Sequence, residues 1–344
     1  MGKTVTFGEI MLRLKAPGFE RLLQRPELEA TFGGGEANVA VSLSLLGRRV
    51  SYVTALPDNP VADAALRELA RYGVDVSSVA RKKGRLGVYY LESGADQRAS
   101  AVTYDREGSA ISLAKPGDFD WPALLAGADW LHVTGITPAL SQGCADLALE
   151  AVRAARKAGV RVSIDLNYRK KLWNYGKKPS EVMCPIAAEA DLIVANEEDI
   201  QKCLGIGALS VDGSSGPLAA DAYARLLEEV RSRFPSVSRV AVTLRESRSA
   251  DRNGWSALLL GERGLLTSRK YEIDDIVDRV GGGDAFSAAL IFALDEFPGE
   301  DAKALEFAVA ASCLKHSIPG DFNLVTRGEV EALMAGDASG RVRR

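Results

Sequence analysis

Two kinds of apolar segment alternate along most of this chain, and this alternation limits the folds that it can adopt. Short runs rich in β-branched residues, such as 160–167 (VRVSIDLN), are separated by segments with apolar side chains every three or four positions, such as 145–159 (ADLALEAVRAARKAG). Strands that alternate with helices of about 10–15 residues are typical of a mainly parallel sheet with helices on both faces. The sequence therefore predicts an α/β fold with three layers.

Two stretches depart from this rhythm and contain no helical pattern. Residues 13–33 are irregular and contain two prolines, whereas residues 85–106 read as two strands joined by a polar turn at Ser93–Gln97. Together they predict a small β-sheet lid that is inserted into the α/β body. The predicted parts are a body of residues 1–12, 34–84 and 107–335, a lid of residues 13–33 and 85–106, and a tail of residues 336–344.

Charge and cysteine content argue against several classes of partner. The net charge of the 344 residues is -3, and the one basic cluster, 340–344 (GRVRR), reads as a solvated end, so we expect no nucleic-acid binding. The four cysteines form no CxxC pair and no secretory leader is evident, which indicates a cytoplasmic protein. No apolar run approaches the roughly 20 residues that span a bilayer, so we expect no membrane segment.

The segment 277–294 (VDRVGGGDAFSAALIFAL) carries the clearest chemical signal. Its glycines precede a predicted helix, where unpaired backbone N–H groups and the positive end of the helix dipole meet. Glycines allow a ligand to approach this backbone closely, so 281–283 form a candidate anion cradle. Asp284 would repel a phosphate, but it suits a base that takes the proton of an attacking hydroxyl. Taken alone, such a motif more often reflects a tight turn and a helix cap.

A second glycine-rich segment gives this motif a context. Residues 32–47 (FGGGEANVAVSLSLLG) and 278–286 (DRVGGGDAF) follow one another in the order of the two signatures of the ribokinase-like carbohydrate kinases, the PfkB family. The chain resembles that family along almost its whole length. It departs from the C-terminal signature at Arg279, where threonine is usual, and at Gly282, where alanine is usual.

This resemblance implies a fold, cofactors and roles for the C-terminal motif. The fold is ribokinase-like, with three layers, a mainly parallel central sheet and a small β-sheet lid. ATP is the phosphoryl donor and Mg²⁺ its companion ion. Asp284 is the catalytic base, and the 281–283 amides, chiefly those of Gly281 and Gly283, surround the transferring phosphate. Asp278 is expected to order a loop for a monovalent cation such as K⁺, as in some relatives.

Further motifs indicate which branch of the family the chain resembles. Segments such as 86–92 (LGVYYLE), 163–173 (SIDLNYRKKLW) and 314–323 (LKHSIPGDFN) are similar to those of the 2-keto-3-deoxygluconate kinases within the family. In that branch the matching positions bind the sugar acid. They are Gly34, Asn38, Tyr89, Tyr104, Arg106, Ile136, Arg169 and Asp284. From the residues alone, the two tyrosines are equally compatible with sheet packing.

The nucleotide and metal sites are implied by the same resemblance. Residues 196–199 (NEED) correspond to the family's Asn-x-x-Glu motif, which is linked to magnesium and phosphate. Asp199 stands where glutamate is usual, so either Asp199 acts through water or Glu198 replaces it, and Asp278 is a further candidate ligand. Residues 243–247 (TLRES) replace a glycine-containing nucleotide segment. The expected nucleotide contacts are Asn196, Thr243, Arg245, Gly281, Gly283 and His316, although His316 is as well suited to stabilising a turn.

A sugar acid is also favoured by charge. Burying a carboxylate without a cation is costly, and a guanidinium matches a planar carboxylate. Arg106 and Arg169 lie in segments that we expect to face the sugar, although either could be a solvated surface residue. An ion pair of Arg106 with Asp105 or Glu107 is disfavoured, since neighbours on a strand point to opposite faces.

Three functions follow from these patterns. The first is ATP-dependent phosphorylation of 2-keto-3-deoxygluconate to its 6-phosphate by a homodimer or higher homo-oligomer assembled through the lid. The second is phosphorylation of fructose, ribose or 2-keto-3-deoxygalactonate. The third, a Rossmann-type dinucleotide-binding oxidoreductase or a non-catalytic nucleotide-binding protein, requires a glycine motif after the first strand, and none follows Thr4–Phe7. The sequence therefore favours a carbohydrate kinase.

Overall fold

The structure, a computed structural model, describes residues 2–207 and 217–337. Within these residues, nine strands form a central sheet in the order β14-β13-β12-β11-β10-β9-β1-β4, with β15 paired to β13. The pairs from β4 to β12 are parallel, and those that involve β13 are antiparallel. The basic cluster 340–344 lies outside the described residues. The strands of this sheet are β1 (Lys3–Phe7), β4 (Arg49–Val53), β9 (Ala128–Thr134), β10 (Arg161–Asp165), β11 (Leu192–Ala195), β12 (Arg239–Ser247), β13 (Asn253–Gly261), β14 (Gly264–Thr267) and β15 (Tyr271–Ile273).

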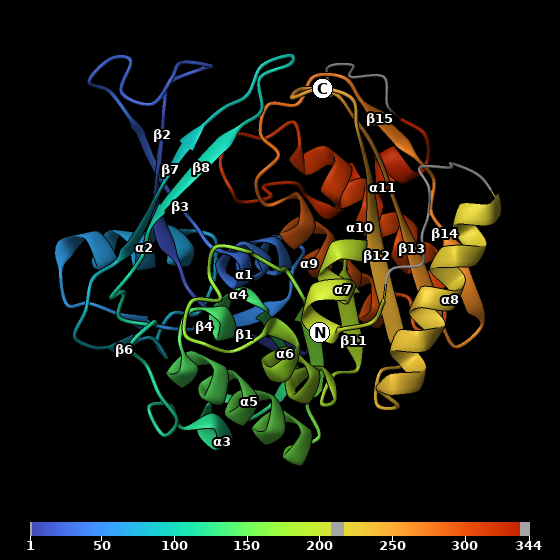
Figure 1. Ribbon diagram of the computed structural model, residues 1–344, viewed down its shortest axis with the longest axis horizontal. Helices are drawn as coiled ribbons and strands as arrows, with labels where there is room; N and C mark the ends of the chain where they lie inside the picture. The colour runs from blue at the N-terminus through green and yellow to red at the C-terminus, as the bar shows by residue number, and fades with distance from the viewer. Residues whose placement is uncertain (1, 208–216, 338–344) are drawn as a thin grey trace.

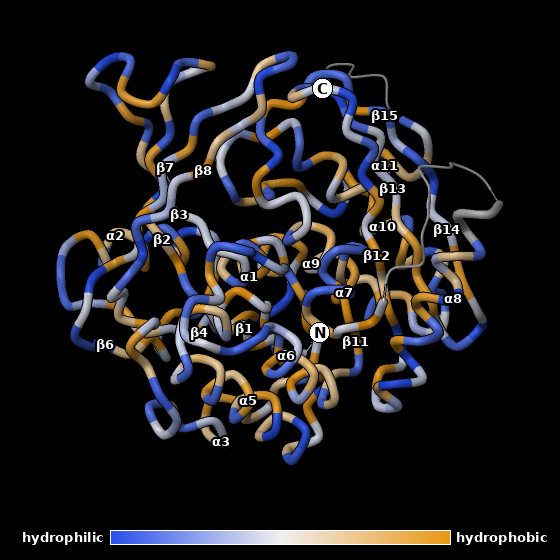
Figure 2. Tube along the Cα trace, in the orientation of Figure 1, coloured by the Kyte–Doolittle hydropathy of each residue, from blue (hydrophilic) through white to orange (hydrophobic). Residues whose placement is uncertain are grey.

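Helices cover both faces of the central sheet and form a separate apolar core on each (Figure 1). On one face lie α1 (Gly35–Leu45), α2 (Pro60–Arg71), α9 (Gly282–Glu296), α10 (Asp301–Lys315) and α11 (Arg327–Met334). On the other lie α3 (Trp121–Leu124), α5 (Gln142–Lys157), α6 (Pro179–Ala187), α7 (Glu197–Leu204) and α8 (Pro217–Arg233), with the short α4 (Ile136–Ala139) beside α5. Hydrophobic residues concentrate along the strands and the helices that cover them (Figure 2). None of the helices in the described ranges is long and apolar enough to cross a membrane.

The ends of the helices explain why these segments fold locally as they do. The N-cap of α2 is Asn59, whose side chain accepts a hydrogen bond from the Ala62 N–H (2.9 Å), and Pro60 occupies the first turn, where its missing N–H costs nothing. The N-cap of α5 is Ser141, which accepts from the Cys144 N–H (3.1 Å). Buried alanine and leucine side chains then recur along α5 on the side facing the sheet.

A second, four-stranded sheet projects from one side of the body, at the upper left in Figure 1. Its order is β3-β2-β7-β8, formed by β2 (Met11–Lys15), β3 (Glu29–Gly33), β7 (Gly87–Glu92) and β8 (Ala101–Asp105). The remaining strands, β5 (Ala55–Leu56) and β6 (Ala80–Arg81), pair with each other. The predicted α/β fold with a mainly parallel sheet and a separate small β-sheet is confirmed. β2 runs across the predicted boundary at residue 12, and assembly through the small sheet stays a prediction.

The chain crosses from one sheet to the other near residues 8–10, 34, 86 and 106. These crossings determine where the candidate site lies. At the first, β1 ends at Phe7, and the Gly8 N–H donates to the Val53 carbonyl (3.2 Å) before β2 begins. A Cβ at Gly34 would lie 2.0 Å from the Glu9 carbonyl oxygen, so the backbones of two crossings touch. The small sheet is therefore held against the body beside the start of α1.

Candidate active site

The loop that precedes α9 brings the glycines and Asp284 to the edge of the central sheet. Gly281 is the N-cap of α9 and has a φ of 82°, a conformation that glycine adopts at little cost. A Cβ at this position would lie 2.1 Å from the carbonyl oxygen of Asp321. Further into α9, the Ser287 hydroxyl donates to Asp165 at the end of β10 (3.4 Å). The start of α9 therefore lies beside the C-terminal end of β10.

The three glycines of the predicted cradle are not equivalent. The Gly282 N–H donates to the Arg279 carbonyl in a tight turn (3.4 Å), and a Cβ on Gly282 would lie 3.1 Å from His316 Cε1. Gly283 is exposed, and no atom lies within 4 Å of a Cβ added there. N–H groups in the first turn of a helix have no acceptor within the helix. Position 283 is thus on the open side of the turn, whereas Gly281 and Gly282 pack against Asp321 and His316.

Asp284 and Asn38 lie far apart in the sequence but meet at the start of α9. Asn38, which is buried on α1, donates from Nδ2 to Asp284 Oδ2 (2.7 Å) and accepts from the Gly34 N–H (3.2 Å). The desolvated position of Asp284 raises its pKa to about 6, although the hydrogen bond from Asn38 favours the charged form. Asp284 remains partly exposed. A carboxylate of this kind is suited to accept a proton near neutral pH.

A buried carboxylate that the sequence analysis did not single out lies beneath this site. Glu36 on α1 accepts hydrogen bonds from the Thr134 N–H (2.9 Å), the Thr134 hydroxyl (2.8 Å) and the Thr137 hydroxyl (3.2 Å). Burial raises its pKa to about 7. These bonds fasten the end of β9 to the first turn of α1. They fix the position of Ile136, a predicted substrate contact that begins α4.

The two arginines expected at the acid end have different environments. Arg106 is buried and donates from Nε to Glu9 Oε2 (2.8 Å), with a second contact from Nη2, and its guanidinium carbon lies 5.3 Å from the centre of the Tyr104 ring. Arg169 is exposed, and its Nη1 donates to the Tyr168 carbonyl (2.9 Å). Arg106 therefore already has a carboxylate partner that the sequence did not reveal. Arg169 is exposed, but it lies near enough to Asp284 to favour the charged form of that carboxyl.

The predicted tyrosines also differ. Tyr89 is buried, and its hydroxyl donates to Asp321 Oδ1 (2.5 Å), whereas Tyr104 is 37% exposed. Their ring centres lie 6.0 Å apart on paired positions of β7 and β8. Asp321 also accepts from Arg13 Nη1 (2.6 Å). Neither Asp321 nor Arg13 was predicted, although Asp321 lies within the quoted segment 314–323.

The residues predicted to handle the metal are not brought together. Asp199 accepts from the Asn196 N–H (3.0 Å) and the Tyr168 N–H (2.9 Å), and Asn196 accepts from the Asp199 N–H (2.9 Å), so this pair caps α7. Asp278 pairs with Arg13 and accepts from the Val280 and Gly320 N–H groups (3.1 Å each). Among the described residues, no group of three His, Cys, Asp or Glu side chains is placed to hold a metal ion. The set Asp199, Glu198 and Asp278 therefore does not form one site.

The predicted nucleotide residues Thr243, Arg245 and His316 come from two elements, and Arg245 lies near enough to His316 to favour its neutral form. Thr243 and Arg245 lie on β12, where Arg245 is exposed. His316 is buried, its Nδ1 lies 2.8 Å from the Ser312 carbonyl oxygen, and its ring packs 5.1 Å from that of Trp255. Burial lowers the pKa of His316 to about 4. His316 is thus a neutral ring that supports Gly282 from behind.

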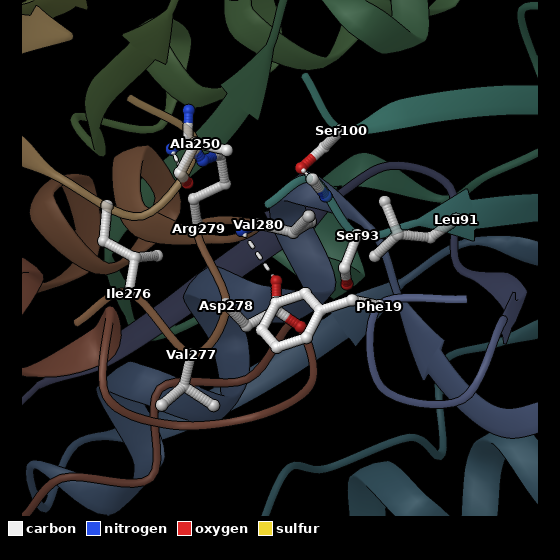
Figure 3. Close-up of a pocket in the computed structure, with 11 residues that line it drawn as sticks. Phe19, Leu91, Ser93, Ser100, Ala250, Ile276, Val277, Asp278, Arg279 and Val280 are labelled. Atoms are coloured by element: carbon white, nitrogen blue, oxygen red, sulfur yellow. Dashed lines mark hydrogen bonds between the residues drawn. The ribbon is translucent and has the colours of Figure 1, made fainter. Parts of the chain in front are cut away.

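A pocket lies between the tip of the small sheet and the loop before the cradle (Figure 3). Residues of the small sheet and its loops, among them Phe19 and Leu91, face the segment 276–280 across it. Arg279 donates to the Ser249 carbonyl (3.3 Å), and the Ala250 N–H donates to the Asp96 carbonyl (2.8 Å). The tip of the small sheet therefore contacts the part of the body that carries the cradle.

Comparisons with known proteins agree with this arrangement. A family model described as pfkB family carbohydrate kinase matches residues 1–244. The crystal structure of a 2-dehydro-3-deoxygluconokinase from Thermotoga maritima is 45% identical, with a TM-score of 0.91, and the match covers 98% of this chain and 100% of that chain. A 2-dehydro-3-deoxygalactonokinase from Haloferax volcanii is 33% identical over 98% of this chain and 98% of its own length. A 2-dehydro-3-deoxygluconokinase from Bacillus subtilis is 28% identical over 96% of this chain and 95% of its own length.

Proposed function

The chain belongs to the pfkB family of carbohydrate kinases, and from this premise we propose that it phosphorylates the terminal hydroxyl of 2-keto-3-deoxygluconate (2-dehydro-3-deoxygluconate) with ATP. It is a sugar-acid kinase of that family with a ribokinase-like fold. The gluco acid is favoured because the Thermotoga maritima relative, which carries that name, aligns with almost the whole chain at the higher identity.

The observation that carries the proposed chemistry is the carboxylate of Asp284 in the first turn of α9, with its pKa raised to about 6 and its Oδ2 held by Asn38. A hydroxyl bound beside Oδ1 would give its proton to Asp284 while its oxygen attacks the terminal phosphorus of ATP, whose bond to the bridging oxygen breaks so that ADP leaves. The amide of Gly283 and the positive end of the helix dipole then face the phosphoryl oxygens. Asp284 both orients and activates the acceptor.

A divalent cation such as Mg²⁺, bound together with the nucleotide, neutralises charge on the phosphates. The acidic surroundings fit such an ion. Asp165 lies at the end of β10, and its burial, together with the nearby carboxylates of Asp199 and Asp284, raises its pKa well above the usual range. Carboxylates this close together would favour a bound cation. Asp165 and Asp199 are the residues that would face it.

The galacto epimer is the second candidate acceptor. The Haloferax volcanii relative, named for that epimer, is 33% identical over nearly the full length of both chains. The two acids differ at one hydroxyl. A site that hydrogen-bonds a hydroxyl rejects an acceptor that leaves its polar groups unpaired, so one epimer should be clearly preferred.

The test is a coupled assay of ADP formation with purified protein and a panel of acceptors. We would compare 2-keto-3-deoxygluconate, 2-keto-3-deoxygalactonate, fructose and ribose, and identify each product by mass and NMR. We expect the highest kcat/KM with the gluco acid and phosphate on its terminal oxygen. A higher kcat/KM with the galacto acid would reassign the substrate. Preference for fructose or ribose would refute a sugar acid as the acceptor.

A further inference from the structure

A fully buried arginine joins the small sheet to the loop before α9. Arg13 lies on β2, and its side chain is 1% exposed. Its Nη1 donates to Asp321 Oδ1 (2.6 Å), and its Nη2 contacts Asp278 Oδ2. Tyr89, the register neighbour of Arg13 on β7, donates to the same oxygen of Asp321 (2.5 Å). Two adjacent strands of the small sheet thus converge on two acids of the body.

Both acids lie against the cradle. The Asp278 carboxylate accepts the Val280 N–H (3.1 Å), one residue before Gly281. The carbonyl of Asp321 occupies the space that a Cβ on Gly281 would need, at 2.1 Å. Lys315, also buried, donates from Nζ to the carbonyls of Asp278 (3.4 Å) and Ile318 (3.0 Å). The backbone that shapes the cradle is therefore fixed by groups that Arg13 holds.

Asp321 also reaches the end of β3, just before α1. A Cβ on Gly33, the last residue of β3, would lie 2.0 Å from Asp321 Oδ2. Asp321 thus fits between the end of β3 and the turn at Gly281, with Arg13 closing the third side. Two carboxylates in so buried a position would repel each other without a cation between them. A displacement of the small sheet that withdrew Arg13 would leave Asp278 and Asp321 without their guanidinium partner, beside the buried ammonium of Lys315.

We propose that Arg13 is a positioning residue through which the small sheet sets the geometry of the glycine cradle, so that the cradle is fully formed only when the small sheet lies against the body. This inference rests on the proposed function, in which the cradle holds the phosphate that is transferred. With the small sheet in place, the cradle is ordered and water is kept from the phosphate. Arg13 does not touch the reacting atoms; it acts through Asp278 and Asp321.

The test compares Arg13→Met with a matched control, Arg48→Met. The side chain of Arg48 is also 1% exposed, and it pairs with Asp295 (2.6 Å). Arg48 lies beside Gly2 and Phe292 rather than beside the cradle. Hydrogen exchange is measured in the free proteins, and the ratio of inorganic phosphate to phosphorylated acceptor is measured during turnover. In Arg13→Met we expect exchange of the 280–284 amides to be at least about tenfold faster. The phosphate ratio should rise severalfold.

The control and a conservative variant separate positioning from general stability. Arg48→Met should lose thermal stability but leave both cradle exchange and the phosphate ratio at the parent values. Arg13→Lys should give intermediate values, because lysine keeps the charge without the two-pronged contact. The proposal would be overturned if the 280–284 amides exchanged at the parent rate in Arg13→Met, or if they exchanged equally fast in Arg48→Met. This holds whichever acceptor the protein phosphorylates. Faster exchange limited to Arg13→Met, in a protein that phosphorylates no sugar acid, would keep this role and reject the proposed function.

Discussion

The candidate site has a phosphate end, at the start of α9, and an acid end, at Arg106 and Arg169. The side chains at these two ends differ in the partners that they already have. At the phosphate end, Asp284 has one side-chain partner, Asn38, and Gly283 faces open space. At the acid end, Arg106 is buried against Glu9, and Arg169 is exposed with a bond to the carbonyl of its own neighbour. The phosphate end is thus open to its ligand. At the acid end, Arg106 would have to bind a substrate carboxylate together with Glu9 or break its contact with Glu9. If the proposed roles hold, chemistry and specificity depend on different kinds of local structure.

The largest expected effect concerns the phosphate end. Asp284→Asn keeps the size of the side chain but cannot accept a proton, so kcat should fall by about two orders of magnitude or more. Nucleotide binding, measured by calorimetry, should change little. The matched control is Asp63→Asn, which alters an acid in the first turn of α2, away from the site. Turnover within a few-fold of the parent in folded Asp284→Asn would show that Asp284 is only part of the helix cap.

The next effect contrasts the two arginines at the acid end. Charge-assisted hydrogen bonds are worth about 1.5–3 kcal/mol, so Arg169→Ala should lower kcat/KM for the sugar acid about tenfold to a hundredfold and leave a neutral sugar nearly unaffected. Because Arg169 is exposed, the melting temperature should hardly change. Equal losses for the acid and the neutral sugar would remove Arg169 from carboxylate recognition.

Arg106→Ala, by contrast, should also destabilise the fold, because it leaves Glu9 buried without its cation. Breaking a buried ion pair in this way costs about 3–5 kcal/mol, which denaturant unfolding would detect. In the double variant Arg106→Ala with Glu9→Gln, part of that stability should return while activity on the acid does not. A stable Arg106→Ala protein would mean that the Glu9 contact contributes little to folding.

A smaller effect is expected from Asn38→Ala, which leaves Asp284 in place but removes its hydrogen bond. That bond favours the charged carboxylate, so its loss should raise the pKa of Asp284 further. The acid limb of the kcat/KM profile should move to higher pH, and activity at neutral pH should fall severalfold. An unchanged acid limb would show that Asn38 contacts the sugar and does not set the pKa of Asp284.

The position of the glycines and Asp284 at the start of a helix could be predicted from the sequence because its determinants are local. A glycine run before a helix dictates where N–H groups point, and the resemblance added Asn38. The contacts of Arg13, Glu9 and Asp321 could not be predicted. Residues 13–33 are irregular in sequence, but Arg13 lies on β2 with its side chain on the same buried face as Met11. A polar side chain on the buried face of a strand gives no signal until its partners, hundreds of positions away, are known.

The pH dependence of kcat/KM in the parent protein tests the central claim most directly, since it reports the base of the free enzyme. Asp284 must be deprotonated to act, and its pKa is raised to about 6. We therefore predict that kcat/KM for the sugar acid is level near pH 7–8 and falls about tenfold per pH unit well below pH 6. A profile that stays level down to pH 5 would contradict the assignment of Asp284 as the base in this desolvated site.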